Sequence, residues 1–471
     1  MFSIEYKLMF KNLSPYKATC ALAVVFVIAH LVAAALLCRE RLFLDTAYYF
    51  FHVVNEEAFR IEHQRVILAI SQLLLWAGVK AHLSLYTLLV LYSITPILFT
   101  AVLLFICLYY FKNETGAWLL IFCNVCGTYF LYYSPMYEVC YATVGFAFLW
   151  FLTEQKFYQT PLQILLYTLI LCICLLGYPL IALGCGALLT YYWVANRKIP
   201  VRLFIIYAIV FALWLLVKTF LISDYEKSNV TVTATNDKVK EVVLMVFSLG
   251  YIWGTLKYLL FHYLVPFGAM IAYIVWSWKR PQRTTAIWLA TSMAIILLII
   301  NLRAGGEGLT HFIHNERSYL LIVPLCLIPF LFTLYPTLTN TVRLAIVGVF
   351  VVACMAESLH TWQHSTYYTH RLQKINSLTA ERLKQGCSLS IADYHQLNPD
   401  LDDWSIGMEA LIFSSMRGKG CVLSDSTGYQ KVVTEKPIDS QHFLIRLDEI
   451  MAKSELNPRY FSLDTGGYCI N

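Results

Sequence analysis

Long apolar runs recur through the first 357 residues and set the strongest limit on the fold. A helix needs about 20 apolar residues to cross a hydrocarbon core about 30 Å thick. The chain is 59% hydrophobic and only 14% charged, with a mean hydropathy of +0.62, which is far from the balance of a soluble domain. We therefore expect an all-α polytopic membrane protein.

Apolar windows of roughly 17 to 25 residues predict about eleven transmembrane helices. The predicted spans are 19–38, 84–111, 117–133, 138–152, 161–177, 179–195, 202–222, 257–279, 284–301, 317–335 and 341–357. Two further apolar segments, 66–79 and about 239–254, are predicted to be interfacial or re-entrant helices. If either of them crosses the membrane, the topology after it inverts.

Basic residues in the short loops test this assignment, since cytoplasmic loops are enriched in Lys and Arg. On the predicted topology, the basic clusters all fall on one side, beginning with Lys7, Lys11 and Lys17 near the N-terminus. The N-terminus is therefore predicted to be cytoplasmic. The net charge of +6 belongs largely to these loops and does not indicate nucleic acid as a partner.

The composition changes after residue 357, which divides the chain into a transmembrane domain, 1–357, and an extracytoplasmic domain, 358–471. Short β-like runs at 387–394 and 418–425 and helical patterns near 403–415 and 441–453 predict a small soluble α/β domain. The segment 357–384 has the pattern of an amphipathic stalk between the two domains.

Most cysteines lie in apolar runs, where a thiol behaves as a small hydrophobic group. Cys387, Cys421 and Cys469 lie in the C-terminal domain instead. In an oxidising compartment two of these three could form a disulfide, and the sequence leaves the pairing open.

The segment 39–65 after the first span carries a dense set of ionisable residues. At its centre is Asp45, which we predict to be a catalytic base, while the plainer interpretation is a helix cap or an ion pair with Arg39 or Arg41. Glu138, in a turn predicted on the same face, is the candidate second acid; a solvated carboxylate at a helix start is the alternative.

Donors and aromatic rings on the same face complete the candidate site. The segment 301–324 concentrates guanidinium and imidazole groups that suit a phosphate, although the i, i+3 histidine pair also has a plainer interpretation as interfacial hydrogen bonding. Aromatic rings near the acids could contact a sugar or a lipid, or form an ordinary interfacial belt. The predicted phosphate contacts are Arg60, Arg65, Arg303, His311, His314 and Arg317, and the predicted sugar or lipid contacts are Tyr48, Tyr49 and Tyr137.

This arrangement resembles the GT-C superfamily of integral membrane glycosyltransferases. The similarity rests on LDTAYYF around Asp45, followed by FRIEHQRVILAISQLLLWAGV, which looks like a catalytic first outer loop with its interfacial helices. The resemblance implies an inverting enzyme that transfers a sugar from a polyprenyl-phosphate carrier to a glycan, lipid or protein acceptor. Thr46 follows Asp45 where double-acid members carry a second acid, so the need for a divalent metal stays open; no other cofactor is expected.

The implied location is the periplasmic face of a bacterial inner membrane, within the cell envelope and in contact with membrane lipids. Two other classes stay open. A polysaccharide polymerase or ligase would use arginines and a histidine in outer loops without an acid in the first loop. A lipid-linked sugar transporter or flippase would show inverted repeats or charged broken helices near the midplane.

Overall fold

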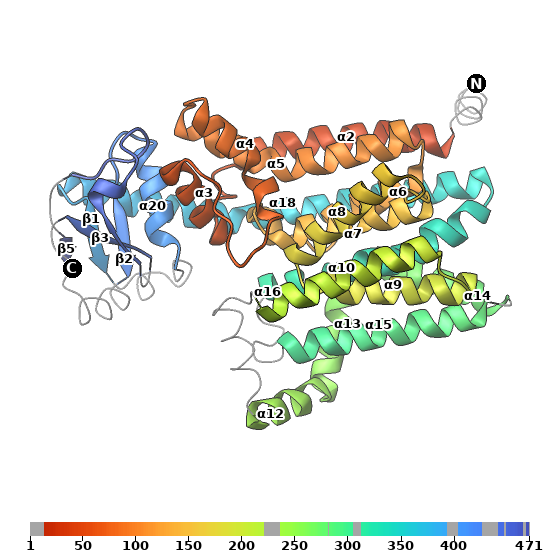
Figure 1. Ribbon diagram of the computed structural model, residues 1–471. Coiled ribbons are helices and arrows are strands. Elements are labelled where there is room, and N and C mark those ends of the chain that lie inside the picture. Colours follow the sequence, from red (N-terminus) through yellow and green to blue (C-terminus); the bar gives the residue numbers. More distant parts are fainter. Residues whose placement is uncertain are drawn as a thin grey trace, which may run out of the picture.

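The computed structural model describes residues 14–220, 236–280, 282–304, 312–392, 404–425, 441–446, 449–464 and 468–470. Elongated helices form a bundle, and a small sheet-containing domain lies at one end of it (Figure 1). In this part of the chain six helices are long and apolar enough to cross a membrane, or seven if one bent helix pair counts as a span. The mostly helical architecture agrees with a membrane protein, while about eleven spans stays a prediction.

The six candidate spans are α2 (Pro15–Leu36), Leu85–Tyr110, α10 (Val201–Phe220), Arg283–Leu302, Asn315–Thr337 and the 45-residue α18 (Asn340–Lys384). The span Leu85–Tyr110 contains α5 (Leu85–Phe105), and Arg283–Leu302 belongs to α15 (Arg283–Ala304). Local signals start several of these helices. The Ser14 and Ser84 hydroxyls accept from backbone N–H groups at the starts of α2 and α5, as helix caps do.

Shorter helices complete the bundle and its surface. They are α3 (Asp45–Glu56), α4 (Leu68–Lys80), α6 (Glu114–Val125), α7 (Glu138–Glu154), α8 (Pro161–Gly177), α9 (Ile181–Asn196), α12 (Asn236–Val246), α13 (Leu249–His262), α14 (Leu264–Trp278), α16 (Phe312–Tyr319) and α17 (Ile322–Pro329). The helix α4 covers the segment predicted to be interfacial, and its 13 residues are too few for an untilted crossing.

The predicted span 117–133 is shorter in the structure, because α6 ends at Val125. Gly127 follows with φ of +64°, in the left-handed region that glycine adopts without strain. A Cβ atom at Gly127 would lie 2.3 Å from the Tyr263 ring. The chain therefore turns at this point and continues as a short 3-10 helix, Leu131–Tyr133.

The predicted span 257–279 is divided between two helices, α13 and α14, with a break at Tyr263. Before it, the residues Lys240–Val246 and Leu249–His262 form a helix pair bent by 62°. Ser248 lies at this bend and its hydroxyl caps α13 by accepting from the Tyr251 N–H. Hydropathy alone does not resolve these breaks, because apolar residues continue through them.

The predicted stalk is helical, since α18 runs without interruption from residue 340 to residue 384 and passes the predicted boundary at 357. It packs against α2 and α6 in the bundle and against α20 (Ile406–Ser415) in the C-terminal domain. One helix therefore connects both parts of the chain.

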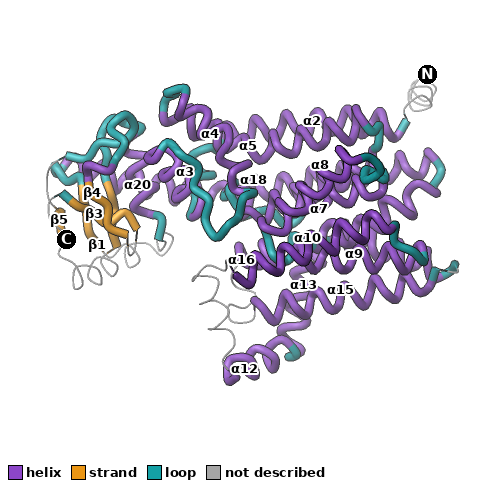
Figure 2. The backbone as a smooth tube through the Cα atoms, viewed as in Figure 1, coloured by secondary structure: helices purple, strands orange, loops and turns teal. Residues whose placement is uncertain are grey.

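The C-terminal domain contains two small sheets, which lie together at the end of the molecule near the C-terminus (Figure 2). In the first, β1 (Leu389–Ala392) lies between β2 (Val422–Asp425) and β5 (Tyr468–Ile470), and both pairings are parallel. The predicted helix at 441–453 is wrong. This segment forms an antiparallel pair, β3 (His442–Arg446) and β4 (Glu449–Ala452), and the buried run Phe443 to Ile445 suits a strand covered by the domain.

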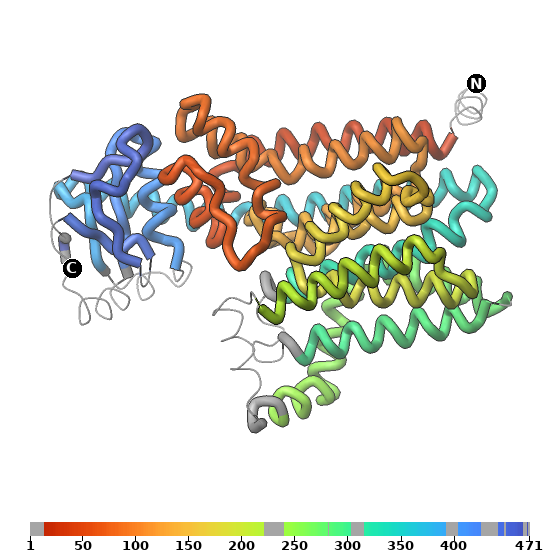
Figure 3. Tube along the Cα trace, viewed as in Figure 1, coloured from red at the N-terminus to blue at the C-terminus, as the bar shows by residue number. Residues whose placement is uncertain are grey.

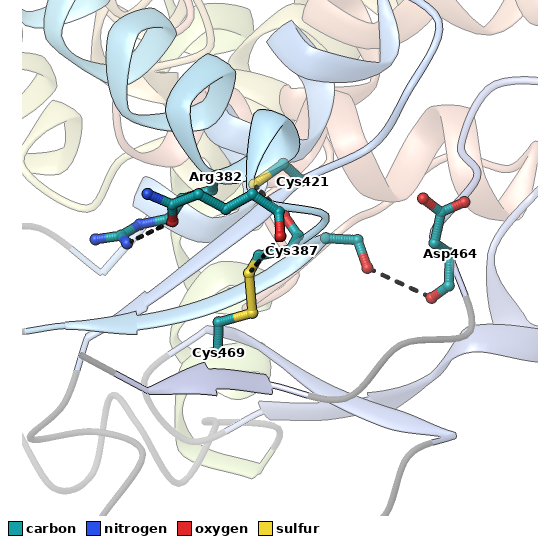
Figure 4. The surroundings of a disulfide bond; sticks show 7 residues. Arg382, Cys387, Cys421, Asp464 and Cys469 are labelled. Carbon is teal, nitrogen blue, oxygen red and sulfur yellow. Dashed lines mark hydrogen bonds between the residues drawn. A yellow bond between two sulfur atoms is a disulfide. The ribbon is translucent and has the colours of Figure 1, made fainter.

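A disulfide joins Cys387 to Cys469, 82 residues later, with a Cα–Cα distance of 6.0 Å (Figure 4). It ties the end of the α18 connection to β5, and so closes the domain covalently. Cys421 is a free, buried cysteine. The pairing that the sequence left open is therefore between the first and last cysteines of the domain.

The N-terminal helix α3 lies against the C-terminal domain, between that domain and the bundle (Figure 3). The Asn55 Nδ2 donates to the Glu455 carbonyl at 3.0 Å, and the Asn457 N–H donates to Asn55 Oδ1 at 2.8 Å. These hydrogen bonds join the C-terminal end of α3 to a segment about 400 positions later in the sequence.

Candidate functional site

Asp45 is the first residue of α3, and the backbone before it is in an unusual conformation. Leu44 has φ of +51° and ψ of −122°, which a γ-branched residue adopts only when its surroundings hold it there. Such a conformation is unfavourable by about 1–3 kcal/mol. The fold thus holds Asp45 at a helix N-terminus, where the backbone N–H groups favour a carboxylate.

Phe43, just before this turn, connects Asp45 to the second acid. The Ser134 hydroxyl donates to the Phe43 carbonyl at 3.2 Å, which ties the loop after α2 to the turn before α7. Glu138 is the first residue of α7 and its side chain is only 2% exposed. The two predicted acids therefore approach the same region from different parts of the chain.

Glu138 is held by two of the predicted arginines. Arg65 Nη1 donates to Glu138 Oε1 at 2.6 Å, and Arg317 Nη2 donates to the same oxygen at 3.1 Å. Arg317 also lies over the Tyr137 ring, 4.6 Å from its centroid. A buried carboxylate needs such partners, because an unpaired charge in the protein interior is strongly unfavourable. The sequence named all four residues, and the structure brings them together.

Asp45 differs from Glu138 because it makes no hydrogen bond or ion pair with any residue that the structure describes. The Asp45 side chain is only partly exposed to solvent, and protein atoms surround it closely. This burial raises the pKa of Asp45 above its ordinary value, and the Glu138 charge adds to the effect. Arg317, Arg65 and Arg446 act in the opposite direction. An acid with a raised pKa and a free carboxyl suits proton transfer.

Arg446, from the C-terminal domain, is a site residue that the sequence analysis missed. It ends β3, and its guanidinium lies 4.8 Å from the Trp404 ring centroid and 5.5 Å from that of Tyr48. Its charge also reaches Asp45. No local motif marks this arginine, and the helical pattern predicted for 441–453 placed it in the wrong kind of element.

Arg60 occupies the edge of the site and is engaged by its own loop. Its guanidinium donates to Glu62 at 3.2 Å and to the Tyr48 hydroxyl at 3.0 Å, and it lies 3.6 Å from Glu56. These contacts fix the loop between α3 and α4. Arg65, Arg317 and Arg446 are the arginines whose charges lower the pKa of Asp45.

The predicted aromatic contacts surround the acids, but their rings are mostly covered. Tyr48, Tyr49 and Tyr137 are 3%, 6% and 2% exposed. The Tyr48 ring meets both Tyr49 and Trp404 edge-on. Trp404, at the mouth of this group, is half-buried and was not predicted. The aromatic groups therefore shape the walls of the site, and Trp404 adds a ring from the C-terminal domain.

Three predicted phosphate contacts cannot be placed. His311 lies outside the described residues, and the side chains of Arg303 and His314 do too. Among the residues that are described, no group of three or more His, Cys, Asp or Glu side chains is arranged to hold a metal ion.

The described site combines two acids with three arginines at the end of the bundle that faces the C-terminal domain. The guanidinium N–H groups that Glu138 does not use could bind an anionic ligand, and Asp45 supplies a base or an orienting acceptor. Comparison with protein-family models, with curated proteins and with solved structures finds no match for this chain.

Proposed function

We propose that the protein is a membrane glycosyltransferase that moves a sugar from a polyprenyl-phosphate carrier to an acceptor hydroxyl. One observation carries this proposal: the unpaired carboxyl of Asp45 lies within the field of Arg65, Arg317 and Arg446. A base next to a cationic phosphate site is what glycosyl transfer from a lipid phosphate requires.

In the proposed reaction, the Asp45 carboxylate takes the proton of the acceptor hydroxyl. The acceptor oxygen forms a bond to the anomeric carbon, and the bond from that carbon to the phosphate oxygen breaks. The electron pair of that bond leaves with the phosphate, whose charge the arginines stabilise. The products are an inverted glycoside and the free polyprenyl phosphate.

Glu138 has a different part in this proposal, because both of its arginines donate to one carboxylate oxygen. It holds Arg65 and Arg317 in position and does not need to exchange a proton. The arginines keep further N–H groups, since a guanidinium has five donors. Arg446 and Trp404 bring the C-terminal domain to the site, where an acceptor could be selected.

The Cys387–Cys469 disulfide supports an extracytoplasmic position for the C-terminal domain, because disulfides persist in oxidising compartments. The site, which lies on the same side, would then use a donor lipid in the outer leaflet. The periplasmic face of a bacterial inner membrane is the proposed location.

The bent pair of α12 and α13 is a feature that a transporter would also show. Its apolar side chains, however, face outward: Leu249, Trp253 and Phe261 are 85%, 70% and 69% exposed. A peripheral helix with this exposure suits contact with lipid and does not line a central pathway. The bend therefore does not favour the transporter class.

The test measures sugar transfer in proteoliposomes from a panel of radiolabelled polyprenyl-phosphate sugars. Wild type is compared with Asp45→Asn and with Glu57→Gln, which removes a partly exposed carboxylate just after the far end of the same helix. We expect Asp45→Asn to lose nearly all turnover while it still binds donor, and Glu57→Gln to stay active. Full activity of Asp45→Asn would contradict the proposal and favour a polymerase or ligase that needs no acid here.

A further inference from the structure

A large apolar cavity lies away from Asp45, between α2, α6 and α18. Its volume is about 600 Å³, within the usual range for sites that bind small molecules. Phe26, Ala33, Trp118 and Val351 are among its walls. The proposed reaction does not use this space.

The cavity opens sideways onto the outer surface of the bundle. Val25, Met355 and Leu359 line it and are 63%, 67% and 59% exposed, on helices that are candidate membrane spans. Along α2 the lining extends from Leu22 to Leu37, which corresponds to about 22 Å of helix at 1.5 Å per residue. This exceeds half of a hydrocarbon core about 30 Å thick. One lipid chain of a leaflet can therefore lie along it.

One end of the cavity lies where α2 ends. Leu37 and Tyr132 line this end. The Arg41 guanidinium lies over the Tyr132 ring, 4.0 Å from its centroid. A positive charge is thus one aromatic ring away from the apolar space.

Arg41 is buried without a full set of partners. Its side chain is 2% exposed, and Nη2 donates to the Ser93 carbonyl at 3.1 Å. Nε and Nη1 have no hydrogen-bond partner among the described residues, and no described carboxylate pairs with the charge. The Tyr132 hydroxyl also lacks a partner; it lies near the guanidinium, but no hydrogen bond of acceptable geometry joins the two. Buried donors of this kind are unfavourable unless a ligand accepts from them.

We propose that this cavity binds an anionic bilayer phospholipid, with one acyl chain in the apolar space and the phosphate at the Tyr132 end, where the Tyr132 hydroxyl can donate to it and the nearby Arg41 charge attracts it. The phosphate supplies acceptor oxygens and a negative charge, which are the two things that Arg41 lacks. The acyl chain fills apolar space that is open to the bilayer. This lipid is separate from the sugar donor, whose phosphate belongs with Arg65, Arg317 and Arg446.

Native mass spectrometry of the detergent-purified full chain tests the proposal directly, using phosphatidylglycerol and phosphatidylcholine of matched acyl chains. Wild type should retain phosphatidylglycerol at least about tenfold more strongly, equivalent to about 1.4 kcal/mol. Arg41→Met keeps the apolar stem and should abolish the preference. Ala33→Trp fills the cavity and should lose both lipids.

The matched control is Ala21→Trp, which places the same ring on an exposed position of α2 outside the cavity lining and should bind as wild type does. Equal retention of the two lipids by wild type, or an unchanged preference in Arg41→Met, overturns the proposal. Displacement of phosphatidylglycerol by polyprenyl phosphate would also overturn it, because the site would then belong to the carrier lipid. None of these measurements depends on sugar transfer, so the proposed function can fail or hold independently.

Discussion

Arg371 of α18 donates a hydrogen bond from Nη1 to Glu409 Oε2 of α20, and both side chains are almost completely buried, at 3% and 2% exposed. The Ser405 hydroxyl donates to the other oxygen of Glu409 at 2.6 Å. This ion pair joins the long helix that leaves the bundle to the central helix of the C-terminal domain.

Glu409→Gln should destabilise the C-terminal domain by about 3–5 kcal/mol, because it removes the carboxylate charge that pairs with the buried Arg371 guanidinium. Hydrogen exchange of the α20 amides measures this local stability. Glu57→Gln weakens a pair with the 48% exposed Lys80, while its side-chain oxygen can still accept from Asn457 Nδ2, so it should change exchange far less. Similar exchange in both variants would show that the buried pair does not hold the domain.

Asp45→Asn should stabilise the protein at neutral pH although it removes activity. The folded-state pKa of Asp45 is raised above its ordinary 3.8, so the native state binds the proton more tightly than the unfolded chain does. Ionisation therefore lowers stability as pH rises through the window above 3.8, and Asn cannot ionise. Thermal unfolding across pH should show a higher midpoint for the variant above that window and no difference below it.

Glu62 provides a comparison with Asp45, because its pKa is shifted in the opposite direction. Burial alone would raise its pKa, but Tyr48 and Arg60 outweigh burial and hold the pKa below its ordinary 4.5. Its ionised form therefore adds stability above that value, and this contribution is lost as pH falls through the folded-state pKa. Glu62→Gln should lower the unfolding midpoint at neutral pH. If Asp45→Asn and Glu62→Gln move the unfolding midpoint in the same direction, the raised pKa of Asp45 is contradicted.

Arg446→Met should reduce turnover on the order of a hundredfold, the effect of removing one preorganised donor. Methionine keeps an apolar stem against Trp404, so the C-terminal domain should still fold. The measurement is kcat and KM for sugar transfer, with Arg459→Met, an exposed arginine of the same domain, as the control. Unchanged kinetics in Arg446→Met would remove the C-terminal domain from the site.

Gly127→Ala should destabilise the bundle by at least about 2 kcal/mol. The substitution forces a Cβ into the left-handed conformation and against the Tyr263 ring, 2.3 Å away. Gly348→Ala, in a helical position with no atom within 4 Å of the added methyl, should be neutral or slightly stabilising. Thermal unfolding in one detergent compares the two, and equal midpoints would contradict the packing argument.

Residues near Asp45 show what the sequence could predict. The dense set of ionisable residues after the first span identified Asp45 and the arginines near it as candidates, but it did not predict that a helix, α3, begins at Asp45. The contacts were not predictable, since Arg65, Glu138 and Arg317 are separated by 73 and 179 positions. Local periodicity carries no information on such pairing.

Both errors fall where contacts outside the local sequence decide the structure. α6 ends at Val125 within a continuous apolar run, and Gly127, which follows with a left-handed conformation, lies close to Tyr263, far away in sequence. The segment that contains Arg446 has apolar spacing compatible with a helix, and pairing of β3 with β4 selects the strand. Tertiary contacts decided both cases, and Arg446 was missed for that reason.

The unbroken helix α18 acts as a rigid strut. Its 45 residues span about 68 Å, more than twice the thickness of a hydrocarbon core. The number of residues in the helix therefore sets the rotation of the C-terminal domain about the helix axis. One inserted residue past the membrane turns the domain by about 100° and takes Arg446 away from Asp45. Seven inserted residues nearly restore the direction of the domain and move it along the axis by about 10 Å. The helical phase of a segment with no contact to the acid therefore determines whether the site can assemble.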